Sequence, residues 1–371
     1  MTFLASLFPA LIVLGLLIII HEFGHFLACR LTGVKVEKFS IGFGPEIFNW
    51  QGGGTRYVIS LLPLGGFVKP AGETVSETDA SGPKPGDYLA APLLSRIFIV
   101  CAGVAMNYIL AFVLFTAIFL MGRPVPGTTV GGFMKGYPAE TSGLAAGDQI
   151  TALNGQKVET WKDLTDLIEI SSGAPVEITV ERGAQKLALK IIPKVESGKD
   201  LFGHTGQVKR LGIMPDPKAN KFEKYGLKDS LRAAWETEVF LTVMTHKAIF
   251  YMIMGKLSMK ALSGPIGIVT MTGSALHLWL PYILQLTATL SISLGVINLF
   301  PVPALDGGHL LFLLIEAVRR KRVSLEFQER ATQVGFLLLL TLMVFIIYND
   351  LVNVDAFDRL RGIISRLTVR Q

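Results

Sequence analysis

Four stretches of the chain consist almost entirely of apolar residues, at residues 3–29, 97–121, 282–300 and 334–352. An α-helix rises about 1.5 Å per residue, so each stretch is long enough to cross a hydrocarbon core of roughly 30 Å. The first stretch has no basic residue before it and no cleavage site of small residues after it, so we expect it to be retained. The pattern predicts a polytopic α-helical membrane protein with four transmembrane helices.

Residues 228–260 form a fifth apolar stretch, which is predicted to stay out of the bilayer core. Lys247 lies at its middle next to His246, and a charged side chain is costly at that depth. A fifth crossing would also put two candidate metal ligands, His21 and Asp306, on opposite sides of the membrane. The stretch is therefore predicted to form an amphipathic helix on the outer surface or partly embedded in it.

Residues 34–70 change to segments rich in Val, Ile, Phe, Tyr and Gly, with three consecutive glycines at 52–54 between them. This pattern predicts a β-hairpin with a flexible turn. An isolated hairpin is marginal in water, so we expect it to return to the membrane domain, where its open edge could accept an extended peptide. An ordinary surface hairpin is the alternative.

Residues 122–195 alternate short strand patterns with one amphipathic helical pattern near 161–168 and an Asn-Gly turn at Asn154. They are predicted to form a small α/β domain. The expected organisation is then 1–121 for the first two membrane helices, the hairpin and a polar loop, 122–195 for the α/β domain, 196–263 for a linker and the amphipathic helix, and 264–371 for the last two membrane helices.

Composition agrees with a membrane protein, since 50% of the 371 residues are hydrophobic, 17% are charged and the mean hydropathy is +0.49. The net charge is +6, but the basic residues gather beside apolar stretches, as at Arg30, Lys35 and residues 319–322. This argues against nucleic-acid binding and places those loops in the cytoplasm. Both termini and the α/β domain are then expected outside. Cys29 and Cys101 lie within or at the end of apolar runs, so no structural disulfide is expected.

The sequence HEFGH, residues 21–25, lies at the cytoplasmic end of the first apolar stretch. Residues four apart share one face of a helix, so His21 and His25 can direct two imidazoles at one metal ion, with Glu22 close to a metal-bound water. Ionisable residues within a membrane helix are expensive and are by default functional. The motif predicts zinc-assisted hydrolysis inside a membrane.

Asp306 is the best candidate for a third ligand, because catalytic zinc usually has three protein ligands and one open position. It is the only carboxylate of the third apolar segment and lies in NLFPVPALDGGH, residues 298–309, where two prolines and two glycines interrupt a helix. Interrupted backbone at membrane depth is tolerated when it is buried in protein or lines a cavity. A helix-capping role for Asp306 is the alternative, and His309 is a weaker ligand candidate.

Five sequence features together resemble the site-2 protease family, and within it the bacterial regulator-of-sigma-E protease group. They are HEFGH, the GGFVK of residues 65–69, a GLAAGDQI phrase at 143–150 that is similar to bacterial PDZ domains, the GPIG of residues 264–267, and residues 298–308. The resemblance covers nearly the whole chain in order. It implies four membrane helices, a membrane-associated β-hairpin and one extracytoplasmic PDZ-like α/β domain.

The resemblance also implies an intramembrane zinc metalloprotease of the bacterial cytoplasmic (inner) membrane. His21, His25 and Asp306 would bind Zn²⁺, and Glu22 would be the catalytic base. The implied partners are the lipid bilayer, single-pass transmembrane substrates such as anti-sigma factors or remnant signal peptides, and peptide termini at the PDZ-like domain. The candidates for substrate binding are Asn298, Pro301, Gly66, Phe67 and Asn107.

Two features depart from the group. There is room for only one PDZ domain, where the best-known enterobacterial member has two. The Gly-Pro-x-x-Asn phrase of the second membrane helix appears here with Val104 in place of proline, between Gly103 and Asn107.

Two other functions are compatible with parts of the pattern. A catalytically inactive metal-binding scaffold could bind peptides through the PDZ-like domain, although a structural zinc site needs neither a base nor an open position. A cation transporter is disfavoured by the four spans and by the absence of a recognisable inverted repeat.

Overall fold

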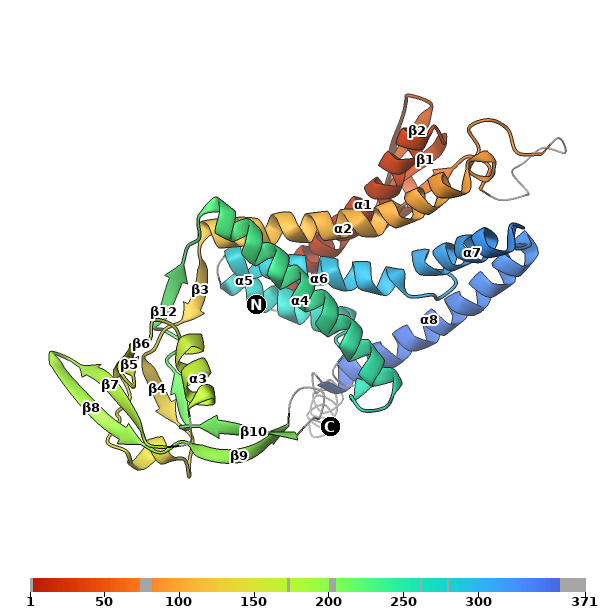
Figure 1. Cartoon of the computed structure of the whole chain (residues 1–371). Helices are drawn as coiled ribbons and strands as arrows, with labels where there is room; N and C mark the ends of the chain where they lie inside the picture. Colours follow the sequence, from red (N-terminus) through yellow and green to blue (C-terminus); the bar gives the residue numbers. More distant parts are fainter. Residues whose placement is uncertain are drawn as a thin grey trace, which may run out of the picture. The chain divides into compact units, whose positions relative to one another are not determined.

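A computed structural model of the chain describes residues 3–73, 82–171, 174–199, 205–259, 262–278 and 280–353 (Figure 1). These residues form two compact units. One contains Met1–Ile118, Ser230–Phe250 and Ser258–Gln371, and the other contains Phe119–Asp229 and Tyr251–Leu257. Each unit is described separately below.

The first unit is mainly helical. Its helices are α1 (Phe3–Thr32), α2 (Leu93–Met121), α4 (Leu227–Ile253), α5 (Pro265–His277), α6 (Leu280–Leu299), α7 (Asp306–Arg319) and α8 (Leu325–Asn353), and a short 3₁₀-helix η2 spans Tyr88–Ala90. Within the described residues, four helices are long and apolar enough to span a membrane: Ala5–Thr32 of α1, Leu93–Met121, Leu280–Leu299 and Leu325–Val352 of α8. The four predicted apolar helices are therefore confirmed, and α4 is not among them.

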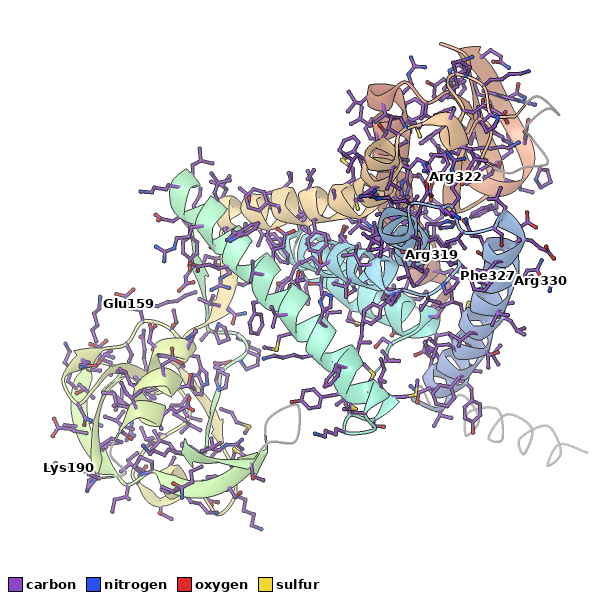
Figure 2. All side chains as sticks on the ribbon, turned by 45° about the vertical axis from the view of Figure 1, so that its right-hand side comes forward. Glu159, Lys190, Arg319, Arg322, Phe327 and Arg330 are labelled. Atoms are coloured by element: carbon purple, nitrogen blue, oxygen red, sulfur yellow. The ribbon has the colours of Figure 1, made fainter. Side chains whose placement is uncertain are left out.

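Helix α8 begins nine residues before the predicted start of its span. Its first turns are polar and solvent-exposed, with an ion pair between Glu326 and Arg330 at i,i+4, so hydropathy alone does not reveal them. Arg319 is the last residue of α7, and Arg322 lies in the segment that connects α7 to α8 (Figure 2). Most of the apolar surface of α8 stays uncovered by the described part of the chain, as expected of a helix that faces lipid.

A buried ion pair joins the beginning of α2 to α7. The guanidinium of Arg96 donates to both carboxylate oxygens of Glu316 at 3.0 and 2.5 Å, and Arg96 is only 4% exposed. Arg322 donates to the carbonyl of Leu89 at 2.6 Å. A two-pronged guanidinium–carboxylate contact defines the direction as well as the distance between two groups, so it orients these helix ends.

The predicted hairpin is present as β1 (Val36–Gly52) and β2 (Thr55–Pro70), paired antiparallel. Gly53 and Gly54 form its turn with φ values of +58° and +81°, which glycine adopts without strain. The register is irregular, and residues 38–41 have partners on both sides, at 66–69 and at 56–59. Strand β2 packs along α1, so the end of the hairpin comes back to the helix that carries HEFGH.

The GPIG of residues 264–267 lies at the beginning of α5, with Pro265 as the first residue of the helix. The carboxylate of Asp350 in α8 accepts hydrogen bonds from the backbone N–H groups of Gly264, Ile266 and Gly267, each at 3.0 Å. A distant acidic side chain therefore caps the helix, and Gly264 has no capping side chain of its own. Such a long-range cap leaves no local signal in the sequence.

The interruption between α6 and α7 is confirmed and covers residues 300–305. Ala304 has a φ of +98°, which is rare for a residue with a side chain. Gly307 and Gly308 are needed at the beginning of α7, because a Cβ on either would come within 2.5 Å of a carbonyl oxygen of this interruption. The backbone therefore folds tightly around the N-terminus of α7, which is where Asp306 lies.

The second unit is an α/β domain. Its elements are β3 (Arg123–Pro126), β4 (Val130–Phe133), η3 (Pro138–Thr141), β5 (Gln149–Leu153), β6 (Gln156–Lys157), α3 (Trp161–Ile170), β7 (Val176–Arg182), β8 (Gln185–Ile191), β9 (Lys194–Lys199), β10 (Thr205–Arg210), β11 (Ile213–Pro215) and β12 (Asn220–Glu223). Strands β6, β5, β7 and β8 form one sheet in that order. Ile150, Leu164 and Ile178 belong to the core between this sheet and α3.

The domain extends beyond the expected boundary at residue 195. Strand β12 pairs with β3 and β11 pairs with β4, so residues 213–223 complete the fold that residues 123–133 begin. These strands are three and four residues long, too short to produce a clear periodic pattern. The polar sequence around them therefore resembles a linker when it is read alone.

Candidate metal centre

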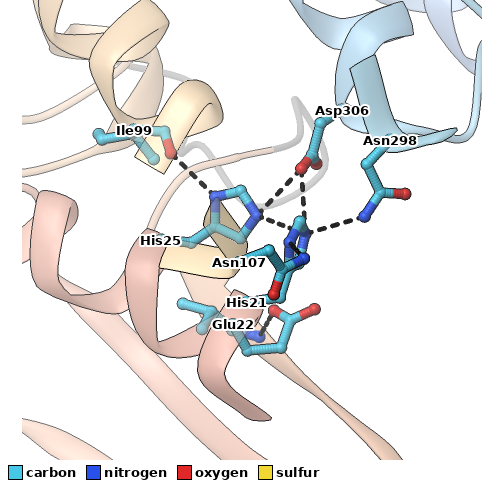
Figure 3. A network of polar contacts seen from close by, with 8 residues as sticks. His21, Glu22, His25, Ile99, Asn107, Asn298 and Asp306 are labelled. Atoms are coloured by element: carbon cyan, nitrogen blue, oxygen red, sulfur yellow. Dashed lines mark hydrogen bonds and ion pairs between the residues drawn. The ribbon is translucent and has the colours of Figure 1, made fainter. Parts of the chain in front are cut away.

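His21 and His25 lie one turn apart on the same face of α1, as their spacing predicts. Their Nε2 atoms are 3.2 Å apart and their ring planes cross at 84° (Figure 3). His21 is buried, with 6% of its surface exposed. The helix alone therefore brings two potential metal ligands together.

Two glycines allow α2 to approach α1 at the position of the histidines. A Cβ on Gly24 would lie 2.3 Å from the carbonyl oxygen of Ala102, and a Cβ on Gly103 would lie 2.3 Å from Nε2 of His25. Atoms in real proteins do not come this close. Helix α2 can therefore pack against the imidazoles only because both positions lack a side chain.

The backbone of α2 also orients His25. Its Nδ1 lies 2.8 Å from the carbonyl oxygen of Ile99. Because a carbonyl oxygen can only accept, Nδ1 must carry the proton, and Nε2 keeps a lone pair that faces His21 and Asp306. This arrangement is the usual one for a metal-binding histidine.

Asp306 reaches the histidines from the first turn of α7. Its Oδ2 lies 3.0 Å from Nε2 of His21 and 3.3 Å from Nε2 of His25. This oxygen is buried, and among the described residues no approach to it has the geometry of a hydrogen bond. Each of the three side chains offers one ligand atom, and these three atoms lie within 4.8 Å of one another. Two imidazole nitrogens and one carboxylate oxygen form the donor set of a catalytic zinc site with an open position, so these residues fit zinc.

Glu22 lies beside the three side chains but outside the group that could hold a metal ion. The backbone N–H of Val68 in β2 donates to its Oε2 at 3.1 Å (Figure 3). The end of the hairpin therefore holds one oxygen of this carboxylate. Gly66 lies close by, since a Cβ there would be 3.8 Å from Cγ of Glu22.

The candidate substrate-binding residues occupy different positions. The amide nitrogen of Asn298, at the end of α6, lies 3.4 Å from Nε2 of His21, and Pro301 is exposed in the interruption that follows. Phe67 is half-buried and stacks on Phe43, with ring centroids 6.2 Å apart. Asn107 differs from the expectation, because it is fully buried and its side chain contacts His21, so it offers no surface to a substrate.

A cavity of about 230 Å³ opens onto two of the metal-binding candidates, His21 and Asp306, and onto Glu22. Its other lining residues are Ile18, Leu294, Asn298, Ala304, Leu305 and His309. A second cavity of about 570 Å³, which includes Arg96 and Glu316 in its lining, also borders His309. His309 is thus a wall residue of both cavities and is not part of the candidate ligand group.

Several contributions to the centre were not predicted from the sequence, among them the carbonyl of Ile99 and the steric role of Gly103. Any residue supplies a backbone carbonyl, so no signal in the sequence could identify Ile99. Gly103 carries a weak signal, since glycine is unfavourable within a helix and its presence there often has a packing reason.

Comparison with known proteins agrees with this geometry. The sequence model of peptidase family M50 matches residues 9–342. The metalloprotease MmpA of Caulobacter vibrioides is 32% identical, with 98% of this chain and 99% of that protein covered. Relatives from Agrobacterium fabrum and Campylobacter jejuni, whose names place them among zinc metalloproteases, are each 34% identical over 92% of this chain, with 94% and 91% of their own lengths covered.

Among solved structures, PDZ domains of SdrC-like proteins match part of the chain. The domain from Listeria innocua has 27% sequence identity and a TM-score of 0.19, with 24% of this chain and 92% of that chain covered. The domain from Listeria monocytogenes has 25% identity and the same TM-score, with 24% and 87% covered.

The family match and the relatives confirm the resemblance to site-2 proteases, and they support zinc as the metal. The four apolar helices make the chain a multi-pass membrane protein. This protein is a membrane zinc metalloprotease, and the chain belongs to peptidase family M50.

Proposed function

We propose that this metalloprotease hydrolyses a peptide bond within a transmembrane segment of a single-pass membrane protein, such as an anti-sigma factor or a remnant signal peptide. His21, His25 and Asp306 are the proposed zinc ligands, and Glu22 is the proposed general base. The observation that carries this proposal is the close approach of the three ligand atoms next to Glu22. His21, Glu22 and His25 lie on a helix that is apolar enough to span a membrane.

Zinc held by these three side chains would supply a Lewis acid and an activated water molecule. The protein contributes the base, since Glu22 has one oxygen held by the N–H of Val68 and can take the water's proton on the other. It then delivers that proton to the leaving amide nitrogen. Asn298 lies near the ring of His21, where it can donate to a carbonyl oxygen of the substrate.

A helical substrate must unwind before it can be cleaved, because its amides are hydrogen-bonded within the helix. Gly66 and Phe67, at the end of β2 beside Glu22, provide a strand edge that can pair with an extended peptide. Pro301, in the interrupted backbone after α6, would line the opposite side of the unwound segment. The proposed substrate contacts are therefore Gly66, Phe67, Asn298 and Pro301.

The proposal can be tested by cleavage of a tagged transmembrane substrate with the full-length protein in detergent. Glu22→Gln should keep zinc and lose at least about 10²-fold in cleavage rate, since a general base contributes about 10² to 10⁴. Glu326→Gln, which alters an exposed glutamate of α8, is the matched control and should cleave normally. A Glu22→Gln variant that cleaves as fast as the parent would refute the mechanism. If the zinc-loaded parent cleaves no substrate, the alternative of a catalytically inactive metal-binding scaffold would be favoured.

The second unit is the proposed PDZ-like module, and its groove is the proposed site for peptide termini. A cavity of about 230 Å³ lies between α3 and the segment that leads into β11, lined by Trp161, Thr165, Arg210 and Gly212 among others. Among the described residues, β11 pairs only with β4, so its other edge can accept a strand. A labelled peptide with a free carboxylate should bind more tightly than its amidated form, and equal affinities would argue against this role.

We propose that both termini and the second unit face outward from the bacterial inner membrane, with the metal centre toward the cytoplasm. The support is positional, because Arg30, Lys35 and residues 319–322 mark the cytoplasmic ends of their helices. A Ser142→Cys variant should react with an impermeant thiol reagent in intact spheroplasts, whereas a Ser324→Cys variant should react only after lysis. The opposite pattern would invert the topology.

A further inference from the structure

We propose that Asn107 is a positioning residue that keeps the proton of His21 on Nδ1, and that it does so by accepting a hydrogen bond with its side-chain oxygen. Nε2 of His21 then carries the lone pair that zinc needs. The inference rests on the proposed ligand set, and it assigns α2 the task of orienting both metal-binding histidines.

The first support is the contrast between the two histidines. His25 has an unambiguous tautomer, because the Ile99 carbonyl accepts from its Nδ1. The corresponding Nδ1 of His21 faces the side-chain amide of Asn107, with 3.2 Å between His21 Nδ1 and Asn107 Nδ2. An amide nitrogen there would require an unprotonated Nδ1, and a neutral ring would then carry its proton on Nε2 and be unable to bind metal through that atom.

A half-turn of the Asn107 amide removes this conflict. The amide nitrogen and oxygen have nearly the same size, so the rotation exchanges them without moving other atoms. Asn107 Oδ1 is buried and has no hydrogen-bond partner among the described residues, so the rotation breaks no bond to that oxygen. With Oδ1 at Nδ1 of His21, both histidines present a lone pair toward Asp306.

The position of Asn107 is compatible with a positioning role but not with a direct role in the reaction. It has no exposed surface and does not line the cavity of the metal centre. Its backbone carbonyl accepts a hydrogen bond from Ser291 Oγ of α6 at 2.8 Å, which anchors this turn of α2. Figure 3 shows Asn107 against the ring of His21, while Asn298 approaches the same ring from another element.

Two substitutions separate acceptance of a hydrogen bond from simple packing. Asn107→Asp keeps an oxygen acceptor and removes the amide donor, whereas Asn107→Leu has a similar volume and neither group. Zinc affinity is measured by chelator competition on the full-length protein in detergent, and the absorption spectrum of the cobalt-loaded protein reports the ligand set. The Asp variant should match the parent in both, and the Leu variant should bind zinc about 10- to 100-fold more weakly with an altered cobalt spectrum.

Asn349→Leu is the matched control, because Asn349 is also a buried asparagine on a membrane helix, 5% exposed, and its amide donates to the backbone carbonyl of Leu262. It should lower stability without changing zinc affinity. If the Leu variant at 107 does not fold, Asn107→Ala carries the same expectation. If the Asp variant does not fold, parental zinc affinity in the Leu or Ala variant still overturns the inference.

Parental zinc affinity in Asn107→Leu would overturn the inference, and so would equal weakening in the Asp and Leu variants. His21→Ala distinguishes the possible failures. If His21→Ala loses zinc while Asn107→Leu keeps it, the positioning role fails and the ligand set stands. If His21→Ala also keeps zinc, the ligand set itself fails, and the proposed function fails with it.

Discussion

At the scale of single residues, the metal centre depends on how little space is left beside the imidazole rings. Gly103 lies against His25, and no side chain fits between α2 and the ring. The metal centre therefore requires a glycine at position 103 as well as the side chains of its candidate ligands.

Gly103→Ala should displace His25 and lower zinc affinity at least about tenfold, because the added methyl would start 2.3 Å from Nε2. Zinc content after dialysis and the cleavage rate measure this effect. Gly206→Ala is the control, since a Cβ there meets nothing within 4 Å. A Gly103→Ala variant that holds zinc as the parent does would mean that α2 moves aside without cost.

Glu238 is a buried carboxylate of α4, outside the four candidate membrane spans. Burial raises its pKa from 4.5 to about 7. Between these two values the folded protein holds a proton that the unfolded chain has released, so the free energy of unfolding decreases as pH rises through this window. Above about pH 7 the carboxylate is charged in both states and the loss of stability is complete.

Glu238→Gln should therefore stabilise the protein at pH 8, by an amount on the order of 3 kcal/mol because each pKa unit corresponds to about 1.4 kcal/mol. The gain should vanish near pH 4, where Glu238 is protonated in both states. Unfolding midpoints of parent and variant at the two pH values measure it. A gain of equal size at both would show that Glu238 destabilises the fold for a reason other than its charge.

At the scale of elements, the metal centre depends on where α6 ends and α7 begins. Asp306 starts α7, Asn298 lies one residue before the end of α6, and Gly335 of α8 packs against the interruption between them, since a Cβ there would overlap the carbonyl of Pro303. A second such junction lies at α5, where Asp350 of α8 caps the helix.

Asp350→Asn should lower the free energy of unfolding by about 1–3 kcal/mol, because an NH₂ group would face N–H donors that the carboxylate now satisfies. Denaturant unfolding in detergent measures the loss. Asp166→Asn is the control, since it removes only an exposed pair with Lys162 and should cost less than about 1 kcal/mol. Equal effects would show that the cap at α5 contributes no more than a surface ion pair.

At the scale of the whole molecule, the two compact units should respond differently to zinc. The ligand set lies entirely within the first unit, so metal binding should stabilise that unit alone. Zinc at about 100 times its dissociation constant should add about 2.7 kcal/mol.

Removal of zinc with a chelator should abolish cleavage and lower the unfolding temperature of the first unit, and added zinc should restore both. Near-UV spectroscopy and limited proteolysis can follow the two units separately. His21→Ala should show no response to zinc. A shift of the second unit by the same amount would mean that the units unfold together.

Much of this protein follows from local pattern. The four membrane helices can be predicted because an apolar run of sufficient length has few stable alternatives in lipid. The hairpin follows from its β-rich segments and glycine turn, and the pairing of His21 with His25 follows from helical geometry alone. The position of Asp306 could be inferred because it is the only carboxylate of the third apolar segment and lies where that helix is interrupted.

Only the tertiary structure decided the features that join distant segments. The carbonyl of Ile99, the contact between Asn107 and His21, the cap on α5 and the pairing of β12 with β3 connect residues that are 74 or more positions apart. Such contacts depend on how helices and strands pack, and packing leaves no periodic trace in the chain. The sequence by itself determined the membrane helices and the HEFGH ligand pair. Tertiary packing decided how the imidazoles are oriented and that Oδ2 of Asp306 lies against them.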